Sequence, residues 1–272
     1  MIDQTYHIAS IIKGLILDMD GVLWRDNAPL GDLPEIFRVF SELGLRVVLA
    51  TNNASRDVNQ YIDKLLSFGV RVEPWQIVTS GVSTVHYLKE LHPDGGEVYI
   101  LGSKSLIDEL NRAGFYHGGE KPLAVVAALD REITYGKLME ASLLIQHGVP
   151  FVGTNPDKSF PIPGGEAPGT GAILAALEAT TRVSPIIIGK PETRMYSVAL
   201  EHLGTKADTT LAVGDRLETD ILGAQKTGLF SALVLSGIST SDDVKKWEFP
   251  PDIITDDITS LVELLQQARQ KP

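Results

Sequence analysis

Five charged residues in three short segments of this sequence have side chains that could act together on a phosphate group. Asp18 and Asp20 are two carboxylates one residue apart, Asp215 and Asp220 are two more, and Lys190 supplies an ammonium. Carboxylates that leave water need a cation or a proton beside them. Mg²⁺ takes oxygen ligands and usually keeps some coordination positions for water and phosphate oxygens. The set therefore indicates a magnesium site at which a phosphorylated molecule could bind.

Each of these residues also has a purely structural interpretation. Short acidic pairs are common in turns, and Lys190 precedes Pro191, as in a surface turn. Asp220 could be an acidic residue in the first turn of a helix, which the helix dipole favours, or it could orient a metal-bound water. Thr51 could cap a helix, although a hydroxyl beside backbone N–H groups at a helix N-terminus also makes a phosphate cradle. The residue types alone leave these alternatives open.

The reactive residues directly follow four predicted strands. In an open α/β sheet, ligands bind beyond the carboxyl ends of the strands, so side chains at these ends would converge on one crevice. This convergence is a stronger signal than any single motif. The four segments are Leu15–Leu17 before Asp18, Asp20 and Gly21; Val47–Ala50 before Thr51, Asn52 and Asn53; Ile186–Gly189 before Lys190; and Leu211–Gly214 before Asp215.

Short apolar runs alternate with amphipathic stretches along the whole chain, which predicts an α/β fold with a doubly wound, mostly parallel sheet. Predicted helices include Leu33–Leu43, Val58–Phe68 and Pro191–Leu203, which glycines follow. The apolar patch within Met1–Leu17 is interrupted by Asp3 and Lys13. We interpret it as a first core strand rather than a signal peptide.

Residues 81–183 have a strand–helix rhythm of their own and are predicted to form a second domain inserted into the first. The core domain then comprises residues 1–80 and 184–272. In the inserted part we expect strands at Val98–Leu101, Val125–Leu129 and Phe151–Val152, and helices at Lys104–Ala113 and Tyr135–His147.

Composition excludes several classes of protein. The formal net charge of −11 argues against a nucleic-acid partner, and no apolar run reaches the roughly 18 residues of a membrane span. With no cysteine, the chain has neither disulfides nor thiolate chemistry, which is compatible with a cytoplasmic location. Gly164 and Gly169 have the spacing of a phosphate-binding P-loop, but Thr170 stands where that motif needs lysine.

Four motifs, in order, resemble those of the haloacid dehalogenase superfamily. They are Asp18-Met-Asp20-Gly-Val, Thr51-Asn-Asn, Gly189-Lys190-Pro-Glu and Gly214-Asp215-Arg-Leu-Glu-Thr-Asp220. The inserted segment is similar to the C2-type cap of the NagD or 4-nitrophenylphosphatase-like branch, on the residues Val125–Tyr135 and Phe151–Asp157. This resemblance implies a Rossmann-like core with a C2 cap, and a phosphatase of small phosphorylated metabolites.

The resemblance also implies a role for each motif residue. Asp18 is the expected nucleophile, and Asp20 is the expected acid that protonates the leaving oxygen and then helps deprotonate water. Mg²⁺ would be held by Asp18, the backbone carbonyl of Asp20 and Asp215, with Asp220 in support. The expected substrate-binding residues are Gly21, Thr51, Asn52, Asn53 and Lys190.

The cap is expected to close over small substrates, and in this branch it often forms a homodimer interface. Asn155 and Asp157 are candidate substrate contacts, although Asn-Pro-Asp is also a common turn sequence. Two other functions remain open: a phosphotransferase or phosphomutase that uses the same Asp18 chemistry, and a non-catalytic module that binds phosphorylated ligands.

Overall fold

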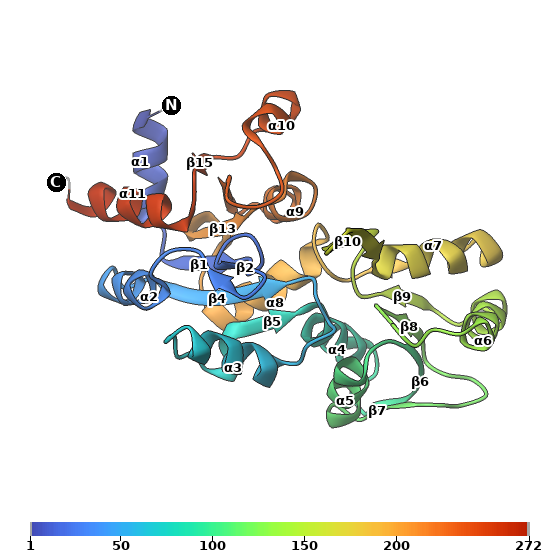
Figure 1. Cartoon of the computed structure of the whole chain (residues 1–272). Coiled ribbons are helices and arrows are strands. Elements are labelled where there is room, and N and C mark those ends of the chain that lie inside the picture. Colours follow the sequence, from blue (N-terminus) through green and yellow to red (C-terminus); the bar gives the residue numbers. More distant parts are fainter. Residues whose placement is uncertain (1, 271–272) are drawn as a thin grey trace. The chain divides into compact units, whose positions relative to one another are not determined.

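The computed structural model describes residues 2–270, which form two compact units (Figure 1). The first, here called the core unit, comprises Met1–Thr51, Val58–Val78 and Lys190–Pro272. The second, the inserted unit, comprises Asn52–Asp57 and Thr79–Gly189. None of the helices in this described part of the chain is both long and apolar enough to cross a membrane.

The core unit is built on a six-stranded sheet in the order β15-β14-β13-β1-β4-β5. Neighbouring strands from β15 to β4 pair in parallel. After β1, the chain forms β4 and β5 on one side of β1. After the inserted unit, it forms β13, β14 and β15 on the other side. The order therefore reverses beside β1, which is where such sheets bind ligands. The strands are β1 (Gly14–Leu17), β4 (Arg46–Thr51), β5 (Ile77–Thr79), β13 (Thr210–Gly214), β14 (Phe230–Val234) and β15 (Ile253–Thr255).

Helices cover both faces of this sheet, because alternate residues of each strand point to opposite sides. Leu15 and Leu17 pack in one apolar cluster with residues of α2 and α11, while the intervening Ile16 is buried on the other side, where α8 packs against β1. The doubly wound α/β prediction is confirmed. The helices are α1 (Ile2–Ile11), α2 (Leu33–Glu42), α3 (Val58–Ser67), α8 (Thr193–Leu203), α9 (Leu222–Thr227), α10 (Ser241–Lys246) and α11 (Ile258–Gln270).

The prediction of a strand at the start of the chain was wrong for residues 2–11, which form α1. Ile8, Ala9 and Ile12 are buried at a spacing that suits one face of a helix, and α1 packs against α11. The strand itself begins only at Gly14. The apolar residues of this segment therefore belong to two elements, α1 and β1, where the sequence predicted a single strand.

The inserted unit has a five-stranded sheet in the order β12-β9-β8-β6-β7, with every neighbouring pair parallel. One face packs against α4 and α5, and the other against α6 and α7. The predicted elements of this segment are confirmed to within a few residues. The strands of the inserted unit are β6 (Gly96–Leu101), β7 (Phe115–His117), β8 (Val125–Ala127), β9 (Phe151–Gly153), β12 (Ile186–Ile187) and the hairpin β10–β11 (Ser159–Ile162, Gly165–Pro168). Its helices are α4 (Ser80–Leu91), α5 (Lys104–Arg112), α6 (Tyr135–Gln146) and α7 (Thr170–Thr181), and of all these elements β7, β10, β11, α4 and α7 were not predicted.

One strand was assigned to the wrong sheet by the sequence analysis. The strand that precedes Lys190 was expected in the sheet of the core domain, but β12 pairs with β9 in the inserted unit. A short apolar run shows that a strand forms but not which neighbour it pairs with, since pairing depends on contacts distant in sequence. Lys190 is nevertheless the first residue of the chain's return to the core unit.

Candidate active site

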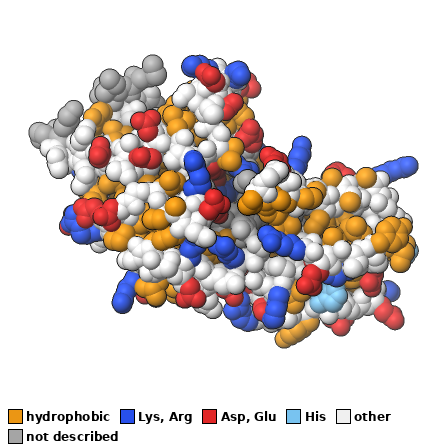
Figure 2. Space-filling view, in the orientation of Figure 1, with side chains coloured by type: hydrophobic (Ala, Val, Ile, Leu, Met, Phe, Trp, Pro, Cys, Tyr) orange, Lys and Arg blue, Asp and Glu red, His pale blue; other side chains and the backbone are white. Residues whose placement is uncertain are grey.

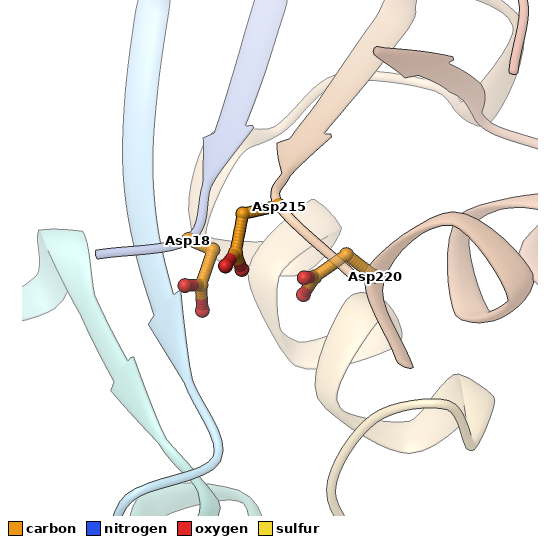
Figure 3. Close-up of side chains that lie close together, drawn as sticks. All are labelled: Asp18, Asp215 and Asp220. Carbon is orange, nitrogen blue, oxygen red and sulfur yellow. The ribbon is translucent and has the colours of Figure 1, made fainter. Parts of the chain in front are cut away.

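Three carboxylates meet at the reversal point of the core sheet. Asp18 follows β1, Asp215 follows β13, and Asp220 lies in the helical turn Leu217–Ile221 that comes next. One oxygen of each lies within 4.8 Å of the others, and Figure 3 shows the three side chains close together. All three are nearly excluded from solvent.

Lys190 inserts its ammonium among these carboxylates. Its Nζ lies 2.5 Å from Oδ1 of Asp18 and 2.6 Å from Oδ1 of Asp220, and it donates to the carbonyl oxygen of Ala50 at 3.1 Å. The lysine is 3% exposed, so it is a buried cation rather than part of a surface turn. Three carboxylates facing one ammonium leave two negative charges uncompensated when all are ionised.

Burial raises the pKa of the Asp18 carboxyl well above its ordinary value; Lys190 opposes this rise, and Asp220 and Asp215 add to it. Burial and the nearby Asp220 raise the pKa of Asp215 to about 6. The hydrogen bond from the Ile238 N–H partly opposes this rise. Burial would lower the pKa of Lys190, but Asp18 and Asp220 raise it well above the ordinary value. The site therefore has an excess of negative charge that favours an additional cation.

We expect the metal-free protein to lose stability as the pH rises from the ordinary carboxyl pKa of 3.8 toward about 6. The folded state binds the Asp215 proton more tightly than the unfolded state, so this stability is present below both pKa values and lost above the folded one. Asp215→Asn should flatten the trend in urea unfolding with EDTA. Saturating Mg²⁺ should reverse it, because the ion binds ionised carboxylates. Identical slopes for wild type and variant would contradict the assignment.

Two glycines leave the space that the Asp215 carboxylate occupies. A Cβ at Gly21 would lie 2.5 Å from its Oδ2, and one at Gly237 would lie 2.0 Å from the same oxygen. Gly21 also has a φ of +84°, which favours glycine. The backbone N–H of Ile238 donates to Oδ2 at 2.8 Å, and that of Ser239 donates to the Asp215 carbonyl at 2.9 Å. The 236–239 segment thus holds Asp215 in position.

Gly237→Ala is expected to weaken Mg²⁺ binding about 10- to 100-fold, as loss of residues that orient metal ligands typically does. The new methyl group would overlap Asp215 and force its carboxylate to move. Isothermal titration of the metal-free protein with Mg²⁺ measures the effect. Gly136→Ala is the matched control, since a Cβ there meets no atom closer than 3.8 Å. Unchanged affinity in Gly237→Ala would show that Asp215 does not depend on this glycine.

The side chain of Asp20 lies outside the carboxylate cluster. Its Oδ1 accepts a hydrogen bond of 2.7 Å from the indole Nε1–H of Trp24. This orientation is compatible with the expectation that only the backbone carbonyl of Asp20 faces the metal. Thr51 is buried at the end of β4, next to the Ala50 carbonyl that Lys190 contacts.

Four other predicted site residues lie together in the inserted unit. The Asn52 amide lies 3.3 Å from the Asp157 carboxylate, and the Asn155 amide donates to the Asn52 carbonyl at 2.7 Å. Oδ1 of Asn155 accepts from the N–H of Asp157, and Oδ1 of Asn53 accepts from the N–H of Ser55. Asn53 and Asn155 therefore both stabilise turns through their side chains, and for Asn155 this favours the turn interpretation.

Comparisons with known proteins identify the family. Residues 15–116 match the haloacid dehalogenase-like hydrolases, and residues 187–261 match a HAD-hydrolase-like family. The 5'-nucleotidase YutF of Bacillus subtilis is 32% identical over 90% of this chain and 96% of its own length. This chain is a haloacid dehalogenase-like hydrolase. The resemblance seen in the sequence is thereby confirmed.

Other proteins match this chain over nearly their full length. The acid sugar phosphatase of Staphylococcus aureus is 32% identical over 94% of this chain and 98% of its own. The 4-nitrophenylphosphatase of Thermotoga maritima has a TM-score of 0.90 and 32% identity over 94% of this chain and 98% of its own. NagD of E. coli has a TM-score of 0.84 and 32% identity over 91% and 97%.

Mg²⁺, the ion expected in such a hydrolase, fits the residues present. The ligand set consists of carboxylate oxygens, which Mg²⁺ prefers. The two uncompensated charges match those of a divalent cation, and burial makes an uncompensated cluster costly. Asp18 and Asp215 are the side chains that would hold the ion. Asp220 already accepts hydrogen bonds from Lys190 Nζ and from the Arg216 N–H. These bonds suit a residue that supports the metal ligands without holding the ion itself.

Sequence reasoning missed the residues that hold these groups in place. Trp24, which contacts Asp20, lies four residues after it in the sequence. The 236–239 segment, which contacts Asp215, lies more than twenty residues after that aspartate. A tryptophan shortly after the Asp-x-Asp motif was a usable signal, since indole N–H groups need partners when buried. The 236–239 segment carried no comparable signal.

Proposed function

We propose that this protein is a Mg²⁺-dependent phosphatase that hydrolyses small phosphomonoesters through an aspartyl-phosphate on Asp18. The observation that carries the proposal is the buried cluster of Asp18, Lys190, Asp215 and Asp220 at the reversal point of the sheet. The names of its relatives support the reaction class, since they are called 4-nitrophenylphosphatase, acid sugar phosphatase and 5'-nucleotidase.

In the first step, an oxygen of Asp18 attacks phosphorus and the bond from phosphorus to the leaving oxygen breaks. Asp20 gives a proton to that oxygen, so the alcohol leaves neutral. A carboxylate nucleophile divides one difficult displacement into two easier ones. Mg²⁺, when bound, offsets the repulsion between the Asp18 carboxylate and a phosphate dianion.

In the second step, water attacks phosphorus and the bond to Asp18 breaks, which regenerates the carboxylate. Asp20 accepts the water proton, and inorganic phosphate leaves. Lys190, Thr51, Asn52, Asn53 and Gly21 are the residues that we expect to bind the phosphate oxygens. Phosphoryl transfer requires mainly positioning and charge stabilisation, which a lysine and backbone N–H groups supply.

The test is phosphate release from a panel of phosphomonoesters with Mg²⁺ or with EDTA. The panel contains 4-nitrophenyl phosphate, a sugar phosphate, a nucleoside monophosphate, phosphoglycolate and pyridoxal phosphate. We expect magnesium-dependent release, and the order of kcat/KM values defines the substrate class. Transfer to an added alcohol without phosphate release would instead indicate a phosphotransferase. Binding of panel members without either reaction would indicate a non-catalytic module.

We further propose that two chains associate through the inserted unit. Tyr135, Met139 and Leu143 of α6 are 83%, 52% and 48% exposed. Their four-residue spacing puts them on one face of the helix, and Figure 2 shows hydrophobic side chains at the surface over the inserted unit. Contiguous exposed apolar side chains mark protein interfaces. Light scattering should give the mass of a dimer for the wild type and that of one chain for Met139→Glu.

A further inference from the structure

Trp24 contacts the carboxylate to which the proton transfers are assigned. Its indole Nε1–H donates to Oδ1 of Asp20 at 2.7 Å. The intervening residues form a closed turn, in which Leu23 N–H donates to the Met19 carbonyl at 2.8 Å and Gly21 N–H to the Trp24 carbonyl at 2.7 Å. This turn brings position 24 back beside position 20, so the contact is built into the local backbone.

The indole itself is rigidly seated. Trp24 is fully buried although it lies only four residues from the exposed Asp20. The Nζ of Lys64 lies 4.2 Å from the centre of its ring and donates to the Asp26 carbonyl at 2.8 Å, while the Phe68 ring lies 5.9 Å away. A cation over an aromatic face and a neighbouring ring both limit its movement. The indole N–H therefore has a fixed position, and it hydrogen-bonds to the exposed carboxylate of Asp20.

We infer that Trp24 is a positioning residue that fixes which oxygen of Asp20 transfers the proton. This inference rests on the proposed function. An indole N–H can only donate, so the oxygen that it faces, Oδ1, must act as acceptor. The transferable proton consequently belongs on Oδ2. Without the indole, the Asp20 side chain would rotate among several orientations and present this proton correctly only part of the time.

The consequence is a dependence on the leaving group. An alkoxide must be protonated as it departs, whereas 4-nitrophenolate leaves readily as an anion. The value of kcat/KM reports the steps up to departure of the leaving group, so a misplaced acid lowers it for alkyl phosphates alone. The second step uses Asp20 as a base for every substrate, so the phosphorylated enzyme would accumulate and 4-nitrophenyl phosphate would give a burst of nitrophenolate.

The experiment compares wild type with Trp24→Phe, which keeps an aromatic ring and removes the N–H donor. For the best alkyl phosphate of the panel we expect kcat/KM to fall about 10- to 100-fold. For 4-nitrophenyl phosphate it should stay nearly unchanged, with a burst that wild type lacks. Phe68→Leu is the matched control, because it disturbs the packing around the same ring but keeps the donor. An equal loss on both substrates, or the same pattern in Phe68→Leu, would overturn the inference.

A second measurement does not need Trp24→Phe to fold. The chain has three tryptophans, so a ¹⁵N–¹H spectrum resolves three indole N–H resonances. Asp20→Ala should shift the Trp24 indole resonance and speed its exchange with water, while the resonances of Trp75 and Trp247 stay in place. Three unmoved resonances would overturn the contact. If Asp18→Asn proves fully active, the proposed function fails; if only the leaving-group pattern is missing, the role of Trp24 alone fails.

Discussion

Asp18→Asn should lower phosphomonoester turnover by about 10⁴-fold or more, as loss of a catalytic nucleophile typically does. An amide cannot form the acyl-phosphate, and it also takes away one side chain of the proposed magnesium site. The variant should fold normally. Burial raises the pKa of Asp18, which means that the folded state disfavours its charge. A neutral amide removes this cost, so the melting temperature in EDTA should not fall.

Phosphate release and thermal unfolding, measured on the same preparations, test both parts of this prediction. Asp208→Asn is the control, since Asp208 is an exposed aspartate of the core unit away from the cluster. It should leave both quantities unchanged. Full activity in Asp18→Asn would disprove the aspartyl-phosphate mechanism. A large fall in melting temperature would show that the Asp18 carboxylate stabilises the metal-free fold.

Lys190→Met is expected to have the second largest effect, on activity and stability together. Turnover should fall about 10²- to 10³-fold, the usual cost of removing one charge-stabilising donor. In EDTA the variant should also lose about 3–5 kcal/mol of stability, as when one partner of a buried ion pair is removed. Lys190 is bonded to both Asp18 and Asp220, so its loss leaves these carboxylates facing one another.

Mg²⁺ gives this prediction a specific signature. The ion should raise the melting temperature of Lys190→Met by more than it raises that of wild type, because it takes over the charge compensation that the ammonium provided. Lys206→Met, at an exposed position of the core unit, serves as the control and should behave as wild type. Equal stabilisation of all three proteins would show that Lys190 and the metal do not share the same carboxylates.

Much of the core site could be predicted because its residues follow buried parallel strands. The runs before Asp18 and Asp215 are short and almost wholly apolar, and both strands pair side by side in the sheet. Once two strands are parallel neighbours, the residues after them must lie near one another. The acidic cluster is therefore a consequence of pattern and topology that is visible in the sequence.

Contacts between residues that are distant in the sequence could not be predicted from the pattern of apolar residues. The strand before Lys190 pairs in the other sheet, and its partner β9 lies more than thirty residues earlier. The space around Asp215 depends on Gly237, whose role appears only when a side chain is placed there. Asn155 completes a turn with its side chain, and the sequence left this use open beside a substrate contact, because an asparagine side chain suits either use.

The pairing of β1 with β13 has a consequence for synthesis of the protein. β1 ends at Leu17 and β13 begins at Thr210, so most of the chain must leave the ribosome before the two strands can meet. The inserted unit ends at Gly189 and can complete its own sheet earlier. At that stage the edge of β1 that pairs with β13 is still unpaired. Unpaired strand edges promote aggregation, so we expect chaperones to bind the nascent chain at this stage. A message truncated before the codon for Asp215 would yield a chain without β14 and β15 and without one of the proposed magnesium ligands.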